Sequence, residues 1–82
     1  MKILYFSWLR ERIGIPSEDY ITEQETVYGL INELSNRELR YAEAFKNLKM
    51  IKVAIDQELI TDMDASIIGI KEIAFFPPMT GG

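Results

Sequence analysis

The sequence predicts one small α+β domain in which a single main helix covers one face of a mixed β-sheet. Its 82 residues allow one modest hydrophobic core and give no sign of a second domain. Two periodic patterns carry this prediction. From Met50 to Asp56, apolar and polar residues alternate, as in a strand with one buried face. The other pattern is the helical spacing of four apolar residues, Val27, Leu30, Ile31 and Leu34.

The N-terminal segment predicts two strands joined by a turn. Lys2–Leu9 is rich in aromatic and β-branched residues and is apolar on both faces, which is typical of a central strand. A single helical turn over Leu9–Gly14 should follow, because glycine commonly ends a helix, and Pro16-Ser17 then turns the chain. We expect Asp19–Glu23 to form a short strand that pairs with the first.

Thr26 is placed to cap the N-terminus of the main helix. Glu23 and Glu25 put negative charge near the positive end of the helix dipole. Ser35-Asn36 is expected to close the helix. The segment Arg37–Lys49 predicts a partly helical connection whose buried face would consist of Leu39, Ala42, Phe45 and Leu48.

Three strands are expected in the rest of the chain. In Met50–Asp56, the core-facing residues would be Ile51, Val53 and Ile55. A turn at Asp56-Gln57 leads into a short partner strand, Glu58–Thr61, and residues 62–69 are irregular. Glu72–Phe76 is the last strand. The predicted order is therefore strand, strand, helix, strand, strand, strand.

The composition argues against several functional classes. A net charge of −4 and a pI near 4.7 are opposite to the basic surfaces that bind nucleic acid or anionic membranes. The chain has neither histidine nor cysteine, and so lacks the commonest general base, the commonest metal ligand and any thiol nucleophile. We expect no catalytic residue, no metal site, no disulfide and a cytoplasmic location.

Two further patterns are interpreted as ordinary surface. Arg10-Glu11-Arg12 interrupts the apolar start in a way that a signal peptide would not. Oxygen-bearing side chains alternate over Asp62–Ser66, as in a calcium loop, but Ile67 and Ile73 stand where that loop needs glycine and glutamate. This segment is expected to be a solvated acidic loop.

The C-terminus is the most informative feature, and it reads Phe75-Phe76-Pro77-Pro78-Met79-Thr80-Gly81-Gly82. Proline donates no ladder hydrogen bond, so Pro77 and Pro78 should end the sheet. We expect a folded domain over 1–76 and an extended, flexible tail over 77–82. Without a Cβ atom, Gly81 and Gly82 could enter a narrow channel. Strand alternation places one of the two phenylalanines in the core and turns the other outward.

Five segments together carry a resemblance that runs the length of the chain. They are Ile3-Leu4-Tyr5-Phe6, Leu9-Arg10-Glu11, Thr26-Val27, Val53-Ala54-Ile55-Asp56-Gln57 and the block from Ile73 to Gly82. In these segments the chain resembles the family of small sulfur-carrier subunits of molybdopterin synthase, which are ubiquitin-like β-grasp proteins. The family usually has Asn where this chain has Asp56, and a Gly-Asp pair where it has Gly69-Ile70-Lys71.

This resemblance implies a carrier without catalytic residues of its own. An ATP-dependent activating enzyme of the ubiquitin-activating type would adenylate Gly82, and a sulfur donor protein would convert it to a thiocarboxylate. The synthase large subunit would then pass the sulfur to cyclic pyranopterin monophosphate during molybdenum cofactor biosynthesis, in a heterotetramer. Phe75 and Phe76 would contact partners, and no cofactor would be bound stably. The tail residues inserted into partner active sites would be Pro77, Pro78, Met79, Thr80 and Gly81.

Other functions stay open at this point. A sulfur carrier for thiamine synthesis or transfer-RNA thiolation would use the same activation and differ only in the acceptor. A ubiquitin-like protein modifier would be joined to lysines by isopeptide bonds. A plain binding domain would tolerate the loss of Gly82.

Overall fold

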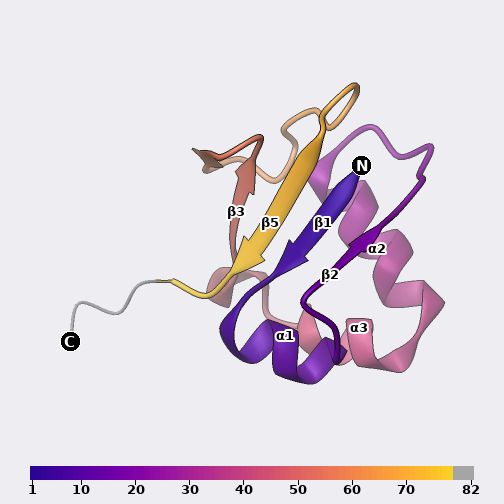
Figure 1. Cartoon of the computed structure of the whole chain (residues 1–82), viewed down its shortest axis with the longest axis vertical. Helices are drawn as coiled ribbons and strands as arrows, with labels where there is room; N and C mark the ends of the chain where they lie inside the picture. The colour runs from indigo at the N-terminus through magenta and orange to yellow at the C-terminus, as the bar shows by residue number, and fades with distance from the viewer. Residues whose placement is uncertain (79–82) are drawn as a thin grey trace.

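A computed structural model describes residues 1–78, which contain five strands, three α-helices and a short 3-10 helix (Figure 1). The predicted α+β class is confirmed. In chain order the elements are β1 (Lys2–Tyr5), α1 (Ser7–Ile13), β2 (Ser17–Asp19), α2 (Val27–Arg37), α3 (Leu39–Ala44), η1 (Leu48–Met50), β3 (Lys52–Ile55), β4 (Glu58–Ile60) and β5 (Glu72–Phe76).

The strands form one mixed sheet in the order β2-β1-β5-β3-β4. Strand β5 lies at the centre, parallel to β1 and antiparallel to β3. Both β1 and β5 therefore run toward α1, and the chain leaves the sheet at that end (Figure 1). The last strand of the sequence is thus held on both sides up to the point where it exits.

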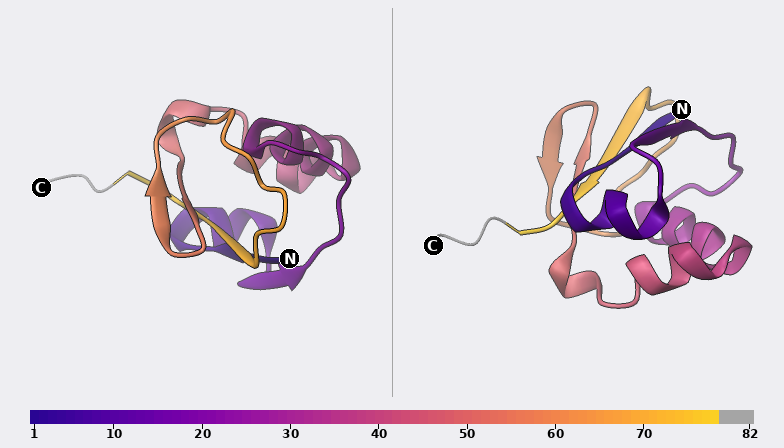
Figure 2. Two further views of the ribbon diagram at one scale, coloured as in Figure 1. Left: turned by 90° about the horizontal axis from the view of Figure 1, so that it is seen from above. Right: turned by 60° about the horizontal axis from the view of Figure 1, so that its bottom comes forward.

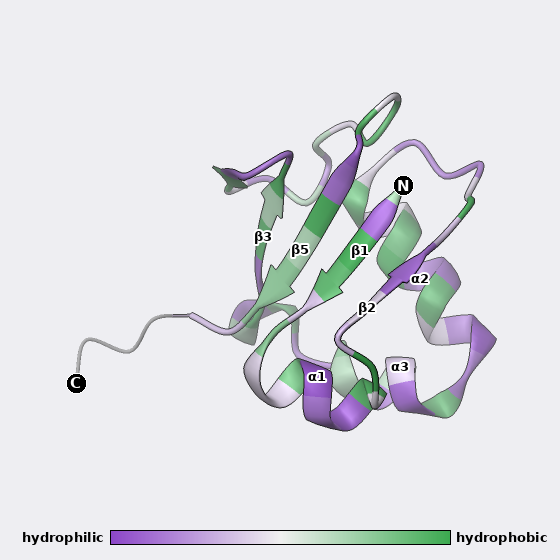
Figure 3. Ribbon diagram, in the orientation of Figure 1, coloured by the Kyte–Doolittle hydropathy of each residue, from purple (hydrophilic) through white to green (hydrophobic). Residues whose placement is uncertain are grey.

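Helices α2 and α3 lie together on one side of the sheet (Figure 2). Helix α2 buries the four apolar residues whose spacing predicts it, and its predicted N-cap is confirmed, because the Thr26 hydroxyl accepts the Gly29 N–H at 3.0 Å. Hydrophobic residues fill the middle of β1 and β5, whereas the outer turns of α2 and α3 are hydrophilic (Figure 3). The core lies between these two layers.

The predicted first strand is too long. Strand β1 ends at Tyr5, and α1 begins at Ser7, which has a positive φ of 54°. The physical reason is that Leu9 and Ile13 are one helical turn apart and both bury against the core. Gly14 ends the helix as predicted, in a left-handed conformation with a φ of 94°.

The second strand begins earlier in the chain than the predicted range Asp19–Glu23, because its position is fixed by pairing with β1. Strand β2 spans Ser17–Asp19, and Glu18 lies opposite Ile3. In that register the Glu18 carboxylate accepts hydrogen bonds from the hydroxyls of Tyr5 and Tyr41. The strand is therefore fixed by polar contacts that strand propensity does not reveal.

The connection after α2 is partly helical, as predicted, but its buried face is different. Leu39 is 75% exposed, whereas Tyr41, Ala44 and Phe45 are buried. Phe45 packs edge-on against Phe75, with ring centroids 5.0 Å apart. These aromatic contacts, made between distant parts of the chain, set the orientation of α3.

The turn at Asp56-Gln57 is confirmed, and both of its residues have positive φ. The Asp56 carboxylate accepts the N–H groups of Lys71 and Glu72 at 3.0 and 2.9 Å. The two places where the sequence departs from the family pattern therefore contact each other. A carboxylate at position 56 ties the β3–β4 turn to the start of β5.

Residues 1–78 include no helix that is long and apolar enough to cross a membrane. The same residues hold no group of three or more His, Cys, Asp or Glu side chains that could bind a metal ion. In the acidic loop, the Asp62 carboxylate accepts the Asp64 N–H at 2.8 Å, which is a local turn contact.

Candidate functional site

The two phenylalanines at the end of β5 face opposite sides of the sheet. Phe75 is fully buried and stacks near Tyr5, with ring centroids 6.2 Å apart. The expectation that Phe75 contacts a partner is wrong, because its ring has no exposed surface. Phe76 is half-buried on the other face, and its contact with a partner stays a prediction.

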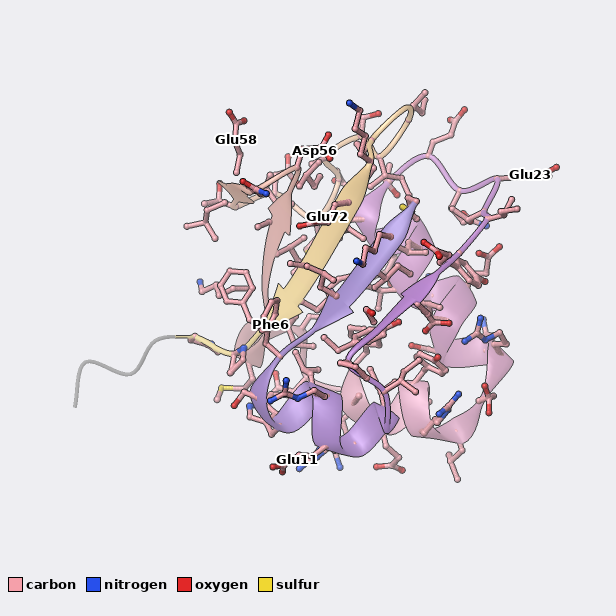
Figure 4. All side chains as sticks on the ribbon, viewed as in Figure 1. Phe6, Glu11, Glu23, Asp56, Glu58 and Glu72 are labelled. Carbon is pink, nitrogen blue, oxygen red and sulfur yellow. The ribbon has the colours of Figure 1, made fainter. Side chains whose placement is uncertain are left out.

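Beside this point lies an apolar groove, which we call the tail groove. Phe6 and Met50, which line it, are 44% and 45% exposed, so the groove presents large apolar side chains to solvent. Phe6 lies close to where the chain leaves β5 (Figure 4). The groove is lined by Phe6, Ser7, Trp8, Met50, Ala74, Phe76, Pro77 and Pro78.

The junction between β1 and α1 builds one wall of the tail groove. The Phe6 N–H donates to the Phe75 carbonyl at 3.1 Å, which continues the pairing of β1 and β5 by one residue. The chain then turns at Ser7, and Trp8 follows on α1. The Arg12 guanidinium lies over the Trp8 ring, 5.1 Å from its centroid, and holds it in place.

A row of small or apolar residues crosses the face of the sheet that α2 does not cover. Cross-strand pairing aligns Leu4 with Ala74, Ala74 with Ala54, and Ala54 with Leu59. Leu59 is 64% exposed. We call these four residues the open-face stripe. Phe6 and Phe76 lie two residues beyond Leu4 and Ala74, so the stripe is continuous with the tail groove.

The most strongly perturbed ionisable groups lie elsewhere, between β2 and α3. Burial alone would raise the pKa of Glu18, but hydrogen bonds from Tyr41, Tyr5 and Arg37 outweigh it and lower that pKa. Burial, together with the Glu18 carboxylate, raises the pKa of Tyr5 far above its usual range. Perturbed pKa values can indicate catalysis. Here each group has its partner and none lines the tail groove, so we interpret the cluster as structural.

The sequence pointed to some of these residues and not to others. Pro77 and Pro78 are half-buried and line the tail groove, whereas Met79, Thr80, Gly81 and Gly82 lie outside the described residues, so their roles stay predictions. Trp8, Met50 and Leu59 had no predicted role. The spacing of Trp8 and Arg12, four residues apart, was an available signal, but it is meaningful only once a helix is known to begin at Ser7.

Comparisons with known proteins identify the family of the chain. The model of the ThiS family matches residues 3–82. The molybdopterin synthase sulfur carrier subunit of Escherichia coli is 32% identical over 82 residues, which cover 100% of this chain and 99% of that protein. The subunit of the same name from Dictyostelium discoideum is 34% identical over 84 residues, covering 99% and 94%.

Two solved structures share the fold. SAMP1 from Haloferax volcanii gives a TM-score of 0.67 at 23% identity, covering 100% of this chain and 98% of that one. A putative molybdopterin converting factor, subunit 1, from Pyrococcus furiosus gives the same TM-score and identity, with 95% of each chain covered. This chain belongs to the ThiS family, has the ubiquitin-like β-grasp fold, and is related along its whole length to molybdopterin synthase sulfur carrier subunits.

Proposed function

We propose that this protein is the sulfur-carrier subunit of a molybdopterin synthase. The observation that carries the proposal is the placement of β5, which is held between β1 and β3 and releases the chain at Pro77 beside an exposed apolar groove. The terminal residues thus start from a fixed point next to a docking surface. The full-length relationship to sulfur carrier subunits supports the same function.

The proposed chemistry takes place at the carboxylate of Gly82. A free carboxylate is ionised at cellular pH and does not react with sulfur nucleophiles, because it has no adequate leaving group. A partner enzyme would transfer AMP from ATP to this carboxylate and release pyrophosphate. Attack by a sulfide equivalent from a donor protein would then expel AMP and leave a thiocarboxylate on Gly82.

The thiocarboxylate sulfur would next bond to a carbon of cyclic pyranopterin monophosphate in the large subunit, displacing an oxygen substituent of that carbon and forming a thioester. Water would then hydrolyse the thioester, which returns the terminus to a carboxylate and leaves the sulfur on the pterin. Two such transfers supply the two sulfurs of the product dithiolene. The chain has neither histidine nor cysteine, so we assign proton transfers to the large subunit. In this proposal the chain itself binds no cofactor, and the complex is a heterotetramer in the cytoplasm.

The tail groove and the open-face stripe are the proposed docking surface. Six residues, from Pro77 to Gly82, span at most about 20 Å when extended. An enzyme with a recessed active site must therefore bring its surface against the groove in order to reach Gly82. Phe6, Met50 and Phe76 offer apolar area at that contact, and apolar and aromatic side chains at the centre of an interface commonly contribute most of its binding free energy.

Intact-protein mass spectrometry tests the proposal. The native chain is incubated with ATP, a sulfur source and an extract of its host, and a gain of about 16 Da is expected as sulfur replaces oxygen. A chain that lacks Gly82 should show no gain. The matched control is Ile21→Ser, which alters an exposed residue that does not line the tail groove and should behave like the native chain.

Two results would contradict the proposal. Higher-mass conjugates through Gly82, without a thiocarboxylate, would indicate a protein modifier. A thiocarboxylate that forms but gives no sulfur to cyclic pyranopterin monophosphate, when the purified large subunit is added, would indicate a carrier for another acceptor.

A further inference from the structure

Basic residues gather around the tail groove although the chain as a whole is acidic. Residues 44–55 contain Lys46, Lys49 and Lys52 and no acidic residue, whereas the whole chain has a net charge of −4. Arg12 lies over Trp8 on the facing wall. We call Arg12, Lys46, Lys49 and Lys52 the basic rim.

Two members of the basic rim, Arg12 on α1 and Lys49 on η1, lie on elements that also line the groove, whereas Lys46 and Lys52 lie on neighbouring segments. Lys52 is the cross-strand partner of Phe76 and is exposed. Lys49 precedes Met50 in η1. Lys46 and Arg12 line a second hollow that shares Trp8 and Met50 with the tail groove. Arg12 and Lys46 therefore border the tail groove, and Lys52 adjoins it through its cross-strand partner Phe76.

Few acidic side chains offset this charge. The Glu43 carboxylate forms an ion pair with the Lys46 ammonium group at 3.4 Å, and both side chains are exposed. Glu11 lies on the outer side of α1 (Figure 4). Within residues 1–78, neither Lys49 nor Lys52 takes part in an ion pair. Asp56 and Glu58 lie at the end of the sheet opposite to Phe6 (Figure 4). Lys49 and Lys52 are thus positive charges near the tail groove that no ion pair among the described residues offsets.

Resting on the proposed function, we propose that the basic rim docks against carboxylates that surround the entrance to the active site of the synthase large subunit. Opposite charges around an apolar contact steer association and fix its orientation, and they do so at little desolvation cost when they stay at the solvated edge. The short tail keeps that entrance within reach of Lys49 and Lys52. The large subunit is the partner that the relatives' name, a synthase subunit, itself implies.

The test measures the association rate of the chain with the purified large subunit of the same organism. We expect the double variant Lys49→Glu/Lys52→Glu to associate at least about tenfold more slowly at low salt. Lys52→Arg, which keeps the charge, should stay within about twofold of native. The control is Lys71→Glu, a single charge reversal at an exposed lysine near Asp56 at the far end. It should stay within about twofold of native, whereas Lys52→Glu alone should slow association by more than that.

Salt dependence separates charge from packing. The Debye length is about 10 Å at 0.1 M salt and shorter at higher salt, so the native and double-variant rates should converge near 0.5 M salt. Three results would overturn the proposal. Lys71→Glu could slow association as much as the double variant does. The slower association of the double variant could be independent of salt, or the double variant could be impaired only in thiocarboxylate formation. If the native chain itself fails to bind the large subunit, the proposed function is at fault. If the native chain binds and the double variant associates equally fast, the proposal for the basic rim is at fault.

Discussion

The two faces of the sheet come from alternate residues of the same strands, yet they differ in side-chain size. The face under α2 carries large side chains that are almost fully buried, namely Ile3, Tyr5, Val53, Ile73 and Phe75. The open face carries Leu4, Ala54, Ala74 and Leu59, two of which are alanines. One face therefore holds the fold together, and the other leaves a shallow apolar surface that a partner can approach closely.

The sharpest test of this contrast uses neighbouring phenylalanines. Phe75→Ala should lower the free energy of unfolding by about 3–5 kcal/mol, because it opens a cavity among Tyr5, Phe45 and the residues around them. Phe76→Ala should cost less than about 1 kcal/mol. Urea denaturation measures both values. A similar loss in the free energy of unfolding for both variants would mean that the open face stabilises the fold as much as the covered face does.

A charge on the open face should weaken binding without weakening the fold. Leu59→Glu replaces an exposed residue, so its free energy of unfolding should stay within about 0.5 kcal/mol of native. Its dissociation constant for the large subunit should rise at least about tenfold, or about 1.4 kcal/mol. Leu39→Glu is the matched control, because Leu39 is also exposed but lies on α3. Titration calorimetry measures both dissociation constants. Equal increases for Leu59→Glu and Leu39→Glu would mean that the open-face stripe is not part of the interface.

The stabilising contribution of Glu18, on the edge strand β2, should depend on pH. Because its hydrogen-bonded carboxylate has a lowered pKa, Glu18 stabilises the fold fully above its unfolded pKa of about 4.3, and this contribution is lost as pH falls through the lower folded value. At neutral pH, Glu18→Gln should cost about 1–2 kcal/mol.

The difference in unfolding free energy between native and variant should therefore shrink below about pH 4. Glu58→Gln, at an exposed position on β4, is the control and should show no such trend. A Glu18→Gln difference that stays constant down to pH 2 would contradict the assignment of this carboxylate as charged in the folded state.

Local sequence patterns were enough to predict α2 and β5, the longest helix and the longest strand. The period of α2, the cap at Thr26 and the full extent of β5 follow from residues close together in the sequence. The end of β1 could not be found in this way, because Trp8 and Leu9 suit a strand as well as a helix. That choice depends on the burial of Leu9 against the rest of the core.

The candidate site shows the same division. The end of β5 after Phe76 could be predicted from Pro77 and Pro78, but not which of Phe75 and Phe76 faces inward. That is set by the register of β5 against β1, where Phe75 lies opposite Tyr5. The open-face stripe depends likewise on pairings between residues far apart in the chain. Three members of the basic rim, Lys46, Lys49 and Lys52, are close together in the sequence, but their position beside the tail groove depends on the fold.

The central position of β5 also has a mechanical consequence. A pull on Pro77 acts along β5, and the hydrogen bonds to β1 and β3 lie across that direction. They would be loaded together in shear rather than opened one at a time. Single-molecule pulling between Met1 and the tail should therefore require more force than pulling between Met1 and the β3–β4 turn. The folded domain should therefore resist unfolding when a partner enzyme binds the C-terminal end of the chain and applies force along β5.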